Sequence, residues 1–146
     1  MNVLEELTEF EDQIDRAHVE RRVLDWERRL QELYTTLEAW LPAGWSAERR
    51  RDIRMDEPLM QKFGVAERQL PELRLICDGA LGATVQPRGL WIVGANGRVD
   101  LLRASDRYVI IDAAENLDPP HWTVAPFFTR QSREDLSRSW FARVLA

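Results

Sequence analysis

The sequence predicts an α+β fold, in which a long N-terminal helix and a C-terminal helix pack on an antiparallel β-meander of five to six strands. Residues 2–41 contain neither Gly nor Pro and are rich in Glu, Leu and Arg, as is typical of helices. From residue 72 onward the pattern changes to period two with β-branched residues, which indicates strands. These strands follow one another too closely for helical crossovers, so neighbours should pair antiparallel.

The size and composition of the chain are those of one folded domain spanning 1–146. With 146 residues, 45% of them hydrophobic, the chain can bury a core without disulfides or metals. We expect a helix or helical arm over 1–41, a helical connector over 42–71, a sheet over 72–129 and a C-terminal helix over 130–146.

The predicted N-terminal helix carries two apolar stripes with spacings of three and four residues. The first stripe consists of Val3, Leu7, Phe10, Ile14 and Ala17. The second consists of Val23, Trp26, Leu30, Leu33, Leu37 and Trp40. At about 100° per residue the two stripes lie on roughly opposite sides of a straight helix, so one sheet cannot bury both.

Two arrangements would bury both stripes. In one, a single long helix packs its second half on the sheet and its first half on another chain. In the other, the helix breaks into a hairpin near 17–22. We favour the long helix, because residues 17–22 contain no Gly, Pro, Asn or Asp to form a turn. A monomer would expose the first stripe, so we expect a homodimer. The expected interface residues are Val3, Leu7, Phe10 and Ile14.

Turn residues divide the segment after the first helix. Pro42 and Gly44 end that helix. We expect one short helical turn over 47–54 and another that starts at Asp56 and ends at Gly64.

The second half of the chain alternates strands with tight turns. The expected strands are 73–77, 82–86, 89–95, 98–104, 107–113 and 122–128. Ser132, followed three residues later by Asp135, resembles a capping box for the last helix. The apolar stripe expected on that helix consists of Leu136, Trp140, Phe141, Val144 and Leu145.

The stretch from Leu90 to Leu102 is interpreted as a hairpin around Asn96-Gly97, because both residues tolerate the positive φ of a tight turn. That pairing places four apolar side chains on one sheet face: Leu90, Ile92, Val99 and Leu101. We expect Ile110 of the next strand on the same face. The opposite face would carry Trp91, Val93, Asp100 and Leu102.

Two apolar faces both need a cover, so we expect the face with Trp91, Val93, Asp100 and Leu102 to bind a partner. A carboxylate among apolar neighbours must be neutralised or hydrogen-bonded. The adjacent Arg98 is the candidate for an ion pair with Asp100.

A loop after the fifth expected strand is the one candidate for chemistry. Four potential metal ligands recur there at every third position: Asp112, Glu115, Asp118 and His121. Carboxylate and imidazole together could bind a divalent ion or perform acid–base catalysis. The alternative is a polar loop that turns the chain, because Pro119 and Pro120 prevent a continuous helix from presenting the four on one face.

The overall charge and the missing motifs favour binding over catalysis. A net charge of −5 disfavours nucleic acid and anionic membranes as partners and suits a basic protein surface. The chain has no phosphate loop, nucleophile elbow or zinc-protease motif, and one cysteine, Cys77. The N-terminus has no signal-peptide pattern, so we expect a cytoplasmic protein.

We therefore expect a non-catalytic protein-binding module without a cofactor, such as an immunity protein, a secretion chaperone or an adaptor. One alternative is a small metal-dependent enzyme that uses the loop over 112–121. The other is a small-molecule sensor with a Trp-lined pocket around Trp91.

Overall fold

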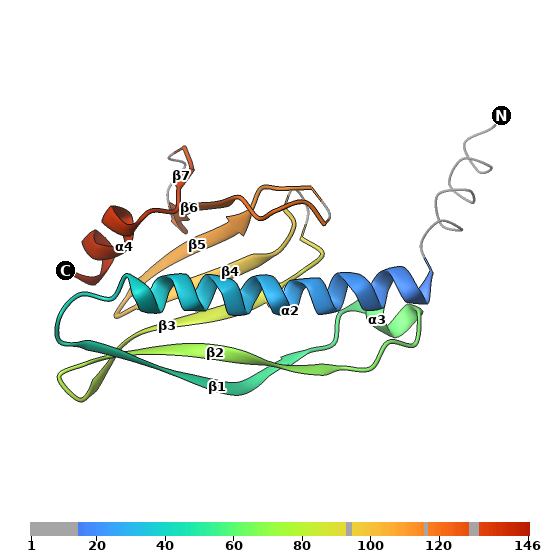
Figure 1. Ribbon diagram of the computed structural model, residues 1–146, viewed down its shortest axis with the longest axis horizontal. Helices are drawn as coiled ribbons and strands as arrows, with labels where there is room; N and C mark the ends of the chain where they lie inside the picture. Colours follow the sequence, from blue (N-terminus) through green and yellow to red (C-terminus); the bar gives the residue numbers. More distant parts are fainter. Residues whose placement is uncertain (1–14, 93–94, 116, 129–131) are drawn as a thin grey trace.

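The computed structural model describes residues 15–92, 95–115, 117–128 and 132–146. It confirms the α+β class: seven antiparallel strands lie in sequence order, and α2 runs along one face of the sheet (Figure 1). The elements in chain order are α2 (Arg16–Ala39), β1 (Trp45–Met55), α3 (Pro58–Lys62), β2 (Arg68–Cys77), β3 (Ala80–Gly89), β4 (Arg98–Arg103), β5 (Asp106–Asp112), β6 (Trp122–Pro126), β7 (Glu134–Asp135) and α4 (Arg138–Leu145).

Helix α2 begins at Arg16 because Asp15 caps it. Asp15 has extended backbone angles, and its side chain accepts a hydrogen bond of 2.8 Å from the backbone N–H of His18. The expectation of one uninterrupted helix over 2–41 is therefore wrong at Asp15. A hairpin that breaks near 17–22 is also wrong, since α2 runs through these residues. The expected dimer-interface residues lie outside the described part of the chain: Val3, Leu7, Phe10 and Ile14.

The core lies between α2 and the sheet face that α2 covers, which we call the inner face. The second predicted stripe of α2 is buried there, as expected: Val23, Trp26, Leu30, Leu33 and Leu37. Opposite it lie fully buried side chains from five strands: Leu73, Leu75, Val85, Val99, Leu101, Ile110 and Val124. Tyr34 adds a polar anchor, because its hydroxyl donates a 2.7 Å hydrogen bond to the Pro71 carbonyl. Burial raises the pKa of this phenol.

The predicted connector over 42–71 is wrong in its first half, where β1 takes the place of a helical turn over 47–54. In the middle of β1, two positions that face α2 hold arginines, whereas Ala47 and Ile53 on either side of them pack against the core. Arg49 binds Glu38 at 2.6 Å and Arg51 binds Glu27 at 3.1 Å, both on α2. Because these two positions are arginines, the sequence of β1 lacks the alternation of apolar and polar residues from which a strand is predicted. The second expected turn is confirmed as α3.

The C-terminal helix is shorter than expected and is capped by a different serine. Ser137 accepts a 3.1 Å hydrogen bond from the backbone N–H of Trp140, so α4 begins at Arg138. The predicted capping box of Ser132 and Asp135 is wrong, because Asp135 belongs to strand β7. No helix among the described residues is long and apolar enough to cross a membrane.

The predicted hairpin around Asn96-Gly97 is wrong. Leu101 pairs with Val85 of β3, not with Ile92, and residues 90–97 form the connection from β3 to β4. The backbone N–H of Asn96 donates to the carbonyl of Asp112 at 2.8 Å, so this dipeptide lies beside the end of β5.

Gly97 leaves no room for a side chain, because it packs against the ring of Trp26. Its φ is +115°, and a Cβ atom there would lie 2.3 Å from the Trp26 ring. The Asn-Gly pair is therefore a buried corner beneath α2. A hairpin around it would have placed Leu101 opposite Ile92, whereas Leu101 pairs with Val85 of β3.

We expect Gly97→Ala to destabilise the protein by about 1–3 kcal/mol more than Gly79→Ala. Gly79 also has a positive φ, +78°, but nothing lies within 4 Å of its would-be Cβ. Both variants place Ala at a positive φ, but only Gly97→Ala adds the clash with Trp26 and a φ far from the left-handed helical region, so the difference reports these two effects together. Urea unfolding measures it, and equal free energies of unfolding would contradict this packing.

Candidate binding groove

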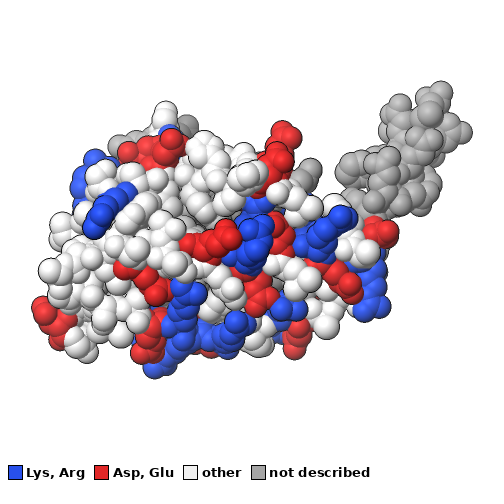
Figure 2. Space-filling view, in the orientation of Figure 1, with Lys and Arg blue, Asp and Glu red and all other residues white. Residues whose placement is uncertain are grey.

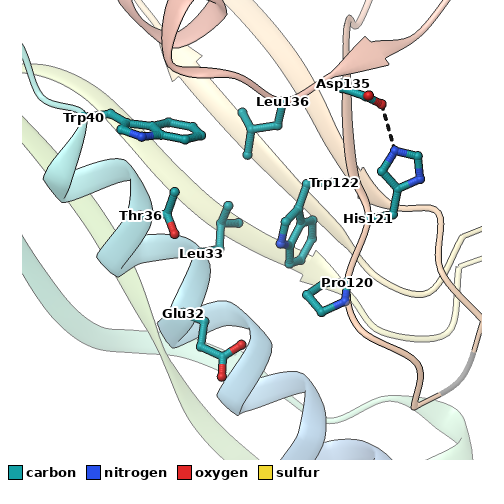
Figure 3. A pocket seen from close by; sticks show the side chains of 9 residues that line it. All are labelled: Glu32, Leu33, Thr36, Trp40, Pro120, His121, Trp122, Asp135 and Leu136. Atoms are coloured by element: carbon teal, nitrogen blue, oxygen red, sulfur yellow. Dashed lines mark hydrogen bonds and ion pairs between the residues drawn. The ribbon is translucent and has the colours of Figure 1, made fainter.

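An open groove of about 380 Å³ lies between the C-terminal half of α2 and the strands β6 and β7. Figure 3 shows its walls, with side chains from α2 on one side and from β6, β7 and the residues beside them on the other. The residues that line it are Glu32, Leu33, Thr36, Trp40, Pro120, His121, Trp122, Asp135 and Leu136.

Two indole rings give the groove its apolar surface. Trp40 is the C-cap of α2, and Trp122 is the first residue of β6. The Trp122 ring lies 6.2 Å from the buried ring of Trp26, which fixes its position. Leu136 donates its backbone N–H to the Trp122 carbonyl at 3.0 Å. The apolar surface is thus built on hydrogen-bonded backbone and a packed core.

Carboxylates stand at the rim of the groove. Glu32 is 55% exposed and pairs with Arg28 at 3.1 Å. Asp135 is 78% exposed and lies 2.7 Å from Nε2 of His121. Figure 2 shows charges of both signs interleaved over the face that carries α2, with a largely uncharged area near its C-terminal end. The groove therefore combines an apolar floor with a rim that carries two exposed carboxylates, each paired with a neighbouring side chain.

A buried ion pair holds the loop that supplies one wall of the groove. Arg29, 1% exposed, donates to Asp25 at 2.5 Å and to Asp112 at 2.6 Å, and it also binds the carbonyl of Asp118. Asp112, which is fully buried, accepts two further hydrogen bonds of 2.9 Å from the N–H groups of Ala114 and His121. Asp112 thereby fixes the position of His121 at the groove.

The structure does not bring the four predicted metal-ligand residues together. Asp112 is engaged by Arg29 in the interior, whereas Glu115 and Asp118 are exposed and His121 faces Asp135. Among the described residues, no group of three or more His, Cys, Asp or Glu side chains is placed to hold a metal ion. This geometry favours the polar-loop interpretation, in which Asp112 caps the turn.

The predicted partner-binding residues are also separated. Asp100 and Leu102 lie on the outer face of the sheet, opposite α2, while Trp91 belongs to the connection between β3 and β4. Val93 lies outside the described residues. The expected ion pair between Asp100 and Arg98 is confirmed at 2.9 Å.

The groove itself was not predicted from the sequence. Trp40 and Trp122 are conspicuous as tryptophans, but they are 82 positions apart, and no local pattern shows that they meet. The helical spacing of Leu33 and Trp40 predicted that both belong to one face of α2. The spacing did not predict that the C-terminal end of this face would line an open groove.

Comparison of the chain with protein-family models, with curated proteins and with solved structures finds no match.

We expect Zn²⁺, Mn²⁺ and Mg²⁺ to leave the melting temperature unchanged, because the described residues form no metal site. A metal that bound the native state would raise the melting temperature. Differential scanning fluorimetry with each metal provides the measurement. A dose-dependent rise that Glu115→Gln with Asp118→Asn abolishes would contradict it. These exposed carboxylates are the suitable targets, since removing Asp112 would leave Arg29 buried without one of its partners and cost about 3–5 kcal/mol.

Proposed function

We propose that this protein is a non-catalytic protein-binding module whose groove receives an apolar, basic segment of a partner protein. The observation that carries this proposal is the open apolar groove with Trp40 and Trp122 in its walls and two exposed carboxylates on its rim. An apolar side chain of the partner contacts the indoles, and a Lys or Arg beside it pairs with Glu32 or Asp135.

The apolar part of the groove supports a protein partner. Tryptophan is enriched among the residues that contribute most to protein–protein binding, since its large ring loses little conformational freedom. Trp122 is fixed against Trp26, and Trp40 by the end of α2, so the surface is already formed before binding. A preformed surface lowers the entropic cost of association.

The charge supports a basic partner. The net charge of −5 attracts a basic protein at long range, and the rim carboxylates act at contact. An immunity protein that neutralises a basic toxin, a secretion chaperone and an adaptor would each use such a site.

A small apolar molecule is the second candidate ligand. The groove volume of about 380 Å³ is within the range of small-molecule pockets. In that case the predicted Trp-lined sensor pocket is centred on Trp40 and Trp122 instead of Trp91.

Binding of fluorescent peptides tests the proposal. We expect the protein to select peptides that combine Leu or Phe with Lys or Arg over acidic peptides of the same length. Trp40→Ala should weaken this binding about tenfold or more. Glu32→Gln with Asp135→Asn should slow association and reduce its salt dependence.

Trp91→Ala is the matched control, because Trp91 is also a half-buried indole but lies outside the groove. It should leave peptide affinity unchanged. Equal losses in Trp40→Ala and Trp91→Ala, with both variants folded by circular dichroism, would contradict the groove as the site. Saturable quenching of Trp fluorescence by an apolar dye, without peptide binding, would favour the small-molecule candidate.

We also propose a homodimer that uses the first predicted stripe. Light scattering at micromolar concentration should give about twice the chain mass of 17.1 kDa. Leu7→Glu with Phe10→Glu should return the mass to that of one chain, because two charges would be placed in an apolar contact. A monomeric wild-type protein would exclude the homodimer.

A further inference from the structure

The outer face of the sheet carries a cluster of arginines around one buried carboxylate. Asp100 is 1% exposed and forms ion pairs with three guanidinium groups from three strands. Arg98 lies 2.9 Å from it, Arg88 lies 3.7 Å away and Arg107 lies 3.8 Å away. The three arginine side chains remain 26%, 49% and 37% exposed, respectively. The carboxylate thus organises three cations that stay accessible to solvent.

The cluster has an excess of positive charge. A fourth arginine, Arg133, reaches the same face and donates to the carbonyls of Val109 and Thr123 and to the Thr123 hydroxyl, all of which are neutral acceptors. Burial, and then the charge of Arg98, lower the pKa of Arg133. Three guanidinium groups around one carboxylate leave a charge of about +2, and Arg133 adds a further positive charge, on a chain whose net charge is −5.

Two phenylalanines extend this cluster. The guanidinium carbons of Arg98 and Arg107 lie 5.6 and 5.0 Å from the centre of the Phe127 ring, which orients both side chains. Phe128 meets Phe127 edge to face with 4.7 Å between ring centres, and it is 82% exposed. Ordered guanidinium groups therefore lie beside an exposed aromatic ring.

We propose that this arginine–phenylalanine surface binds a short acidic segment of a protein partner, one that carries an apolar side chain among its carboxylates. Planar guanidinium groups match carboxylates in a bidentate geometry, and Phe128 contacts the apolar side chain. A long polyanion fits less well, because beyond the arginines it would meet a chain of net negative charge. The surface is distinct from the groove, since none of its arginines or phenylalanines lines the groove.

Fluorescence anisotropy with a labelled peptide of Glu residues around one Phe tests this inference on the full chain. At low ionic strength we expect the acidic peptide to bind at least about tenfold more tightly than the same peptide with Gln in place of Glu. Arg88→Gln with Arg107→Gln should weaken binding about tenfold or more and flatten its salt dependence. Phe128→Ser should weaken binding without changing the salt dependence.

The control variant removes the same charge elsewhere. Arg16 and Arg143 are 66% and 67% exposed and lie outside the cluster, so Arg16→Gln with Arg143→Gln should leave the affinity unchanged. Trp40→Ala should also leave it unchanged, which separates this surface from the groove. Both arginines of the test variant are partly exposed, so it should keep the wild-type melting temperature to within a few degrees.

Three outcomes would overturn the inference. The first is equal affinity for the Glu and Gln peptides, and the second is an equal loss of binding in the control variant. The third is tighter binding of an oligothymidylate with the same number of charges, which would indicate single-stranded nucleic acid as the occupant.

Discussion

The buried contact between Arg29 and Asp112 is the interaction on which the rest of the structure depends. It joins the middle of α2 to the end of β5, and Asp112 in turn accepts backbone hydrogen bonds from the loop that follows. A guanidinium that is 1% exposed requires several acceptors, because desolvation of an unpaired charge is costly. The carbonyl of Asp118 and the carboxylates of Asp25 and Asp112 are these acceptors, and Asp112 also accepts from the N–H of His121, which lines the groove.

Ion pairs on the flanks of α2 complement this central contact. Glu27 accepts from Arg51 and Arg68, and Glu38 pairs with Arg49, so carboxylates of the helix bind the two strands at one edge of the sheet. Burial raises the pKa of Glu27, but the hydrogen bonds from Arg51 and Arg68 outweigh it and lower the pKa overall. The apolar stripe between these contacts supplies the hydrophobic stabilisation, while the ion pairs define the position of α2 across the sheet. The groove exists because α2 ends beside β6 in that position.

Two local groups of charged side chains stand out from a surface on which both signs are otherwise mixed. The groove beside α2 has carboxylates at its rim, whereas the outer face collects arginines around Asp100. If both proposed surfaces bind, a chain with net charge −5 would use one of them for a basic segment and the other for an acidic segment, on two partners or on two regions of one partner.

The sequence by itself determined the α+β class, the extent of α2 after Asp15, its buried stripe and the ion pair of Asp100 with Arg98. Each of these follows from local periodicity or from neighbouring residues. Only the tertiary structure decided that β3, and not the expected strand over 89–95, pairs with β4, and that 45–55 is a strand. It also decided that Asp112 meets Arg29, 83 positions away. The physical reason is that strand pairing and buried ion pairs depend on residues distant in the chain. In the middle of β1, Arg49 and Arg51 pair with carboxylates of α2, so this strand lacks the apolar alternation from which a strand is predicted.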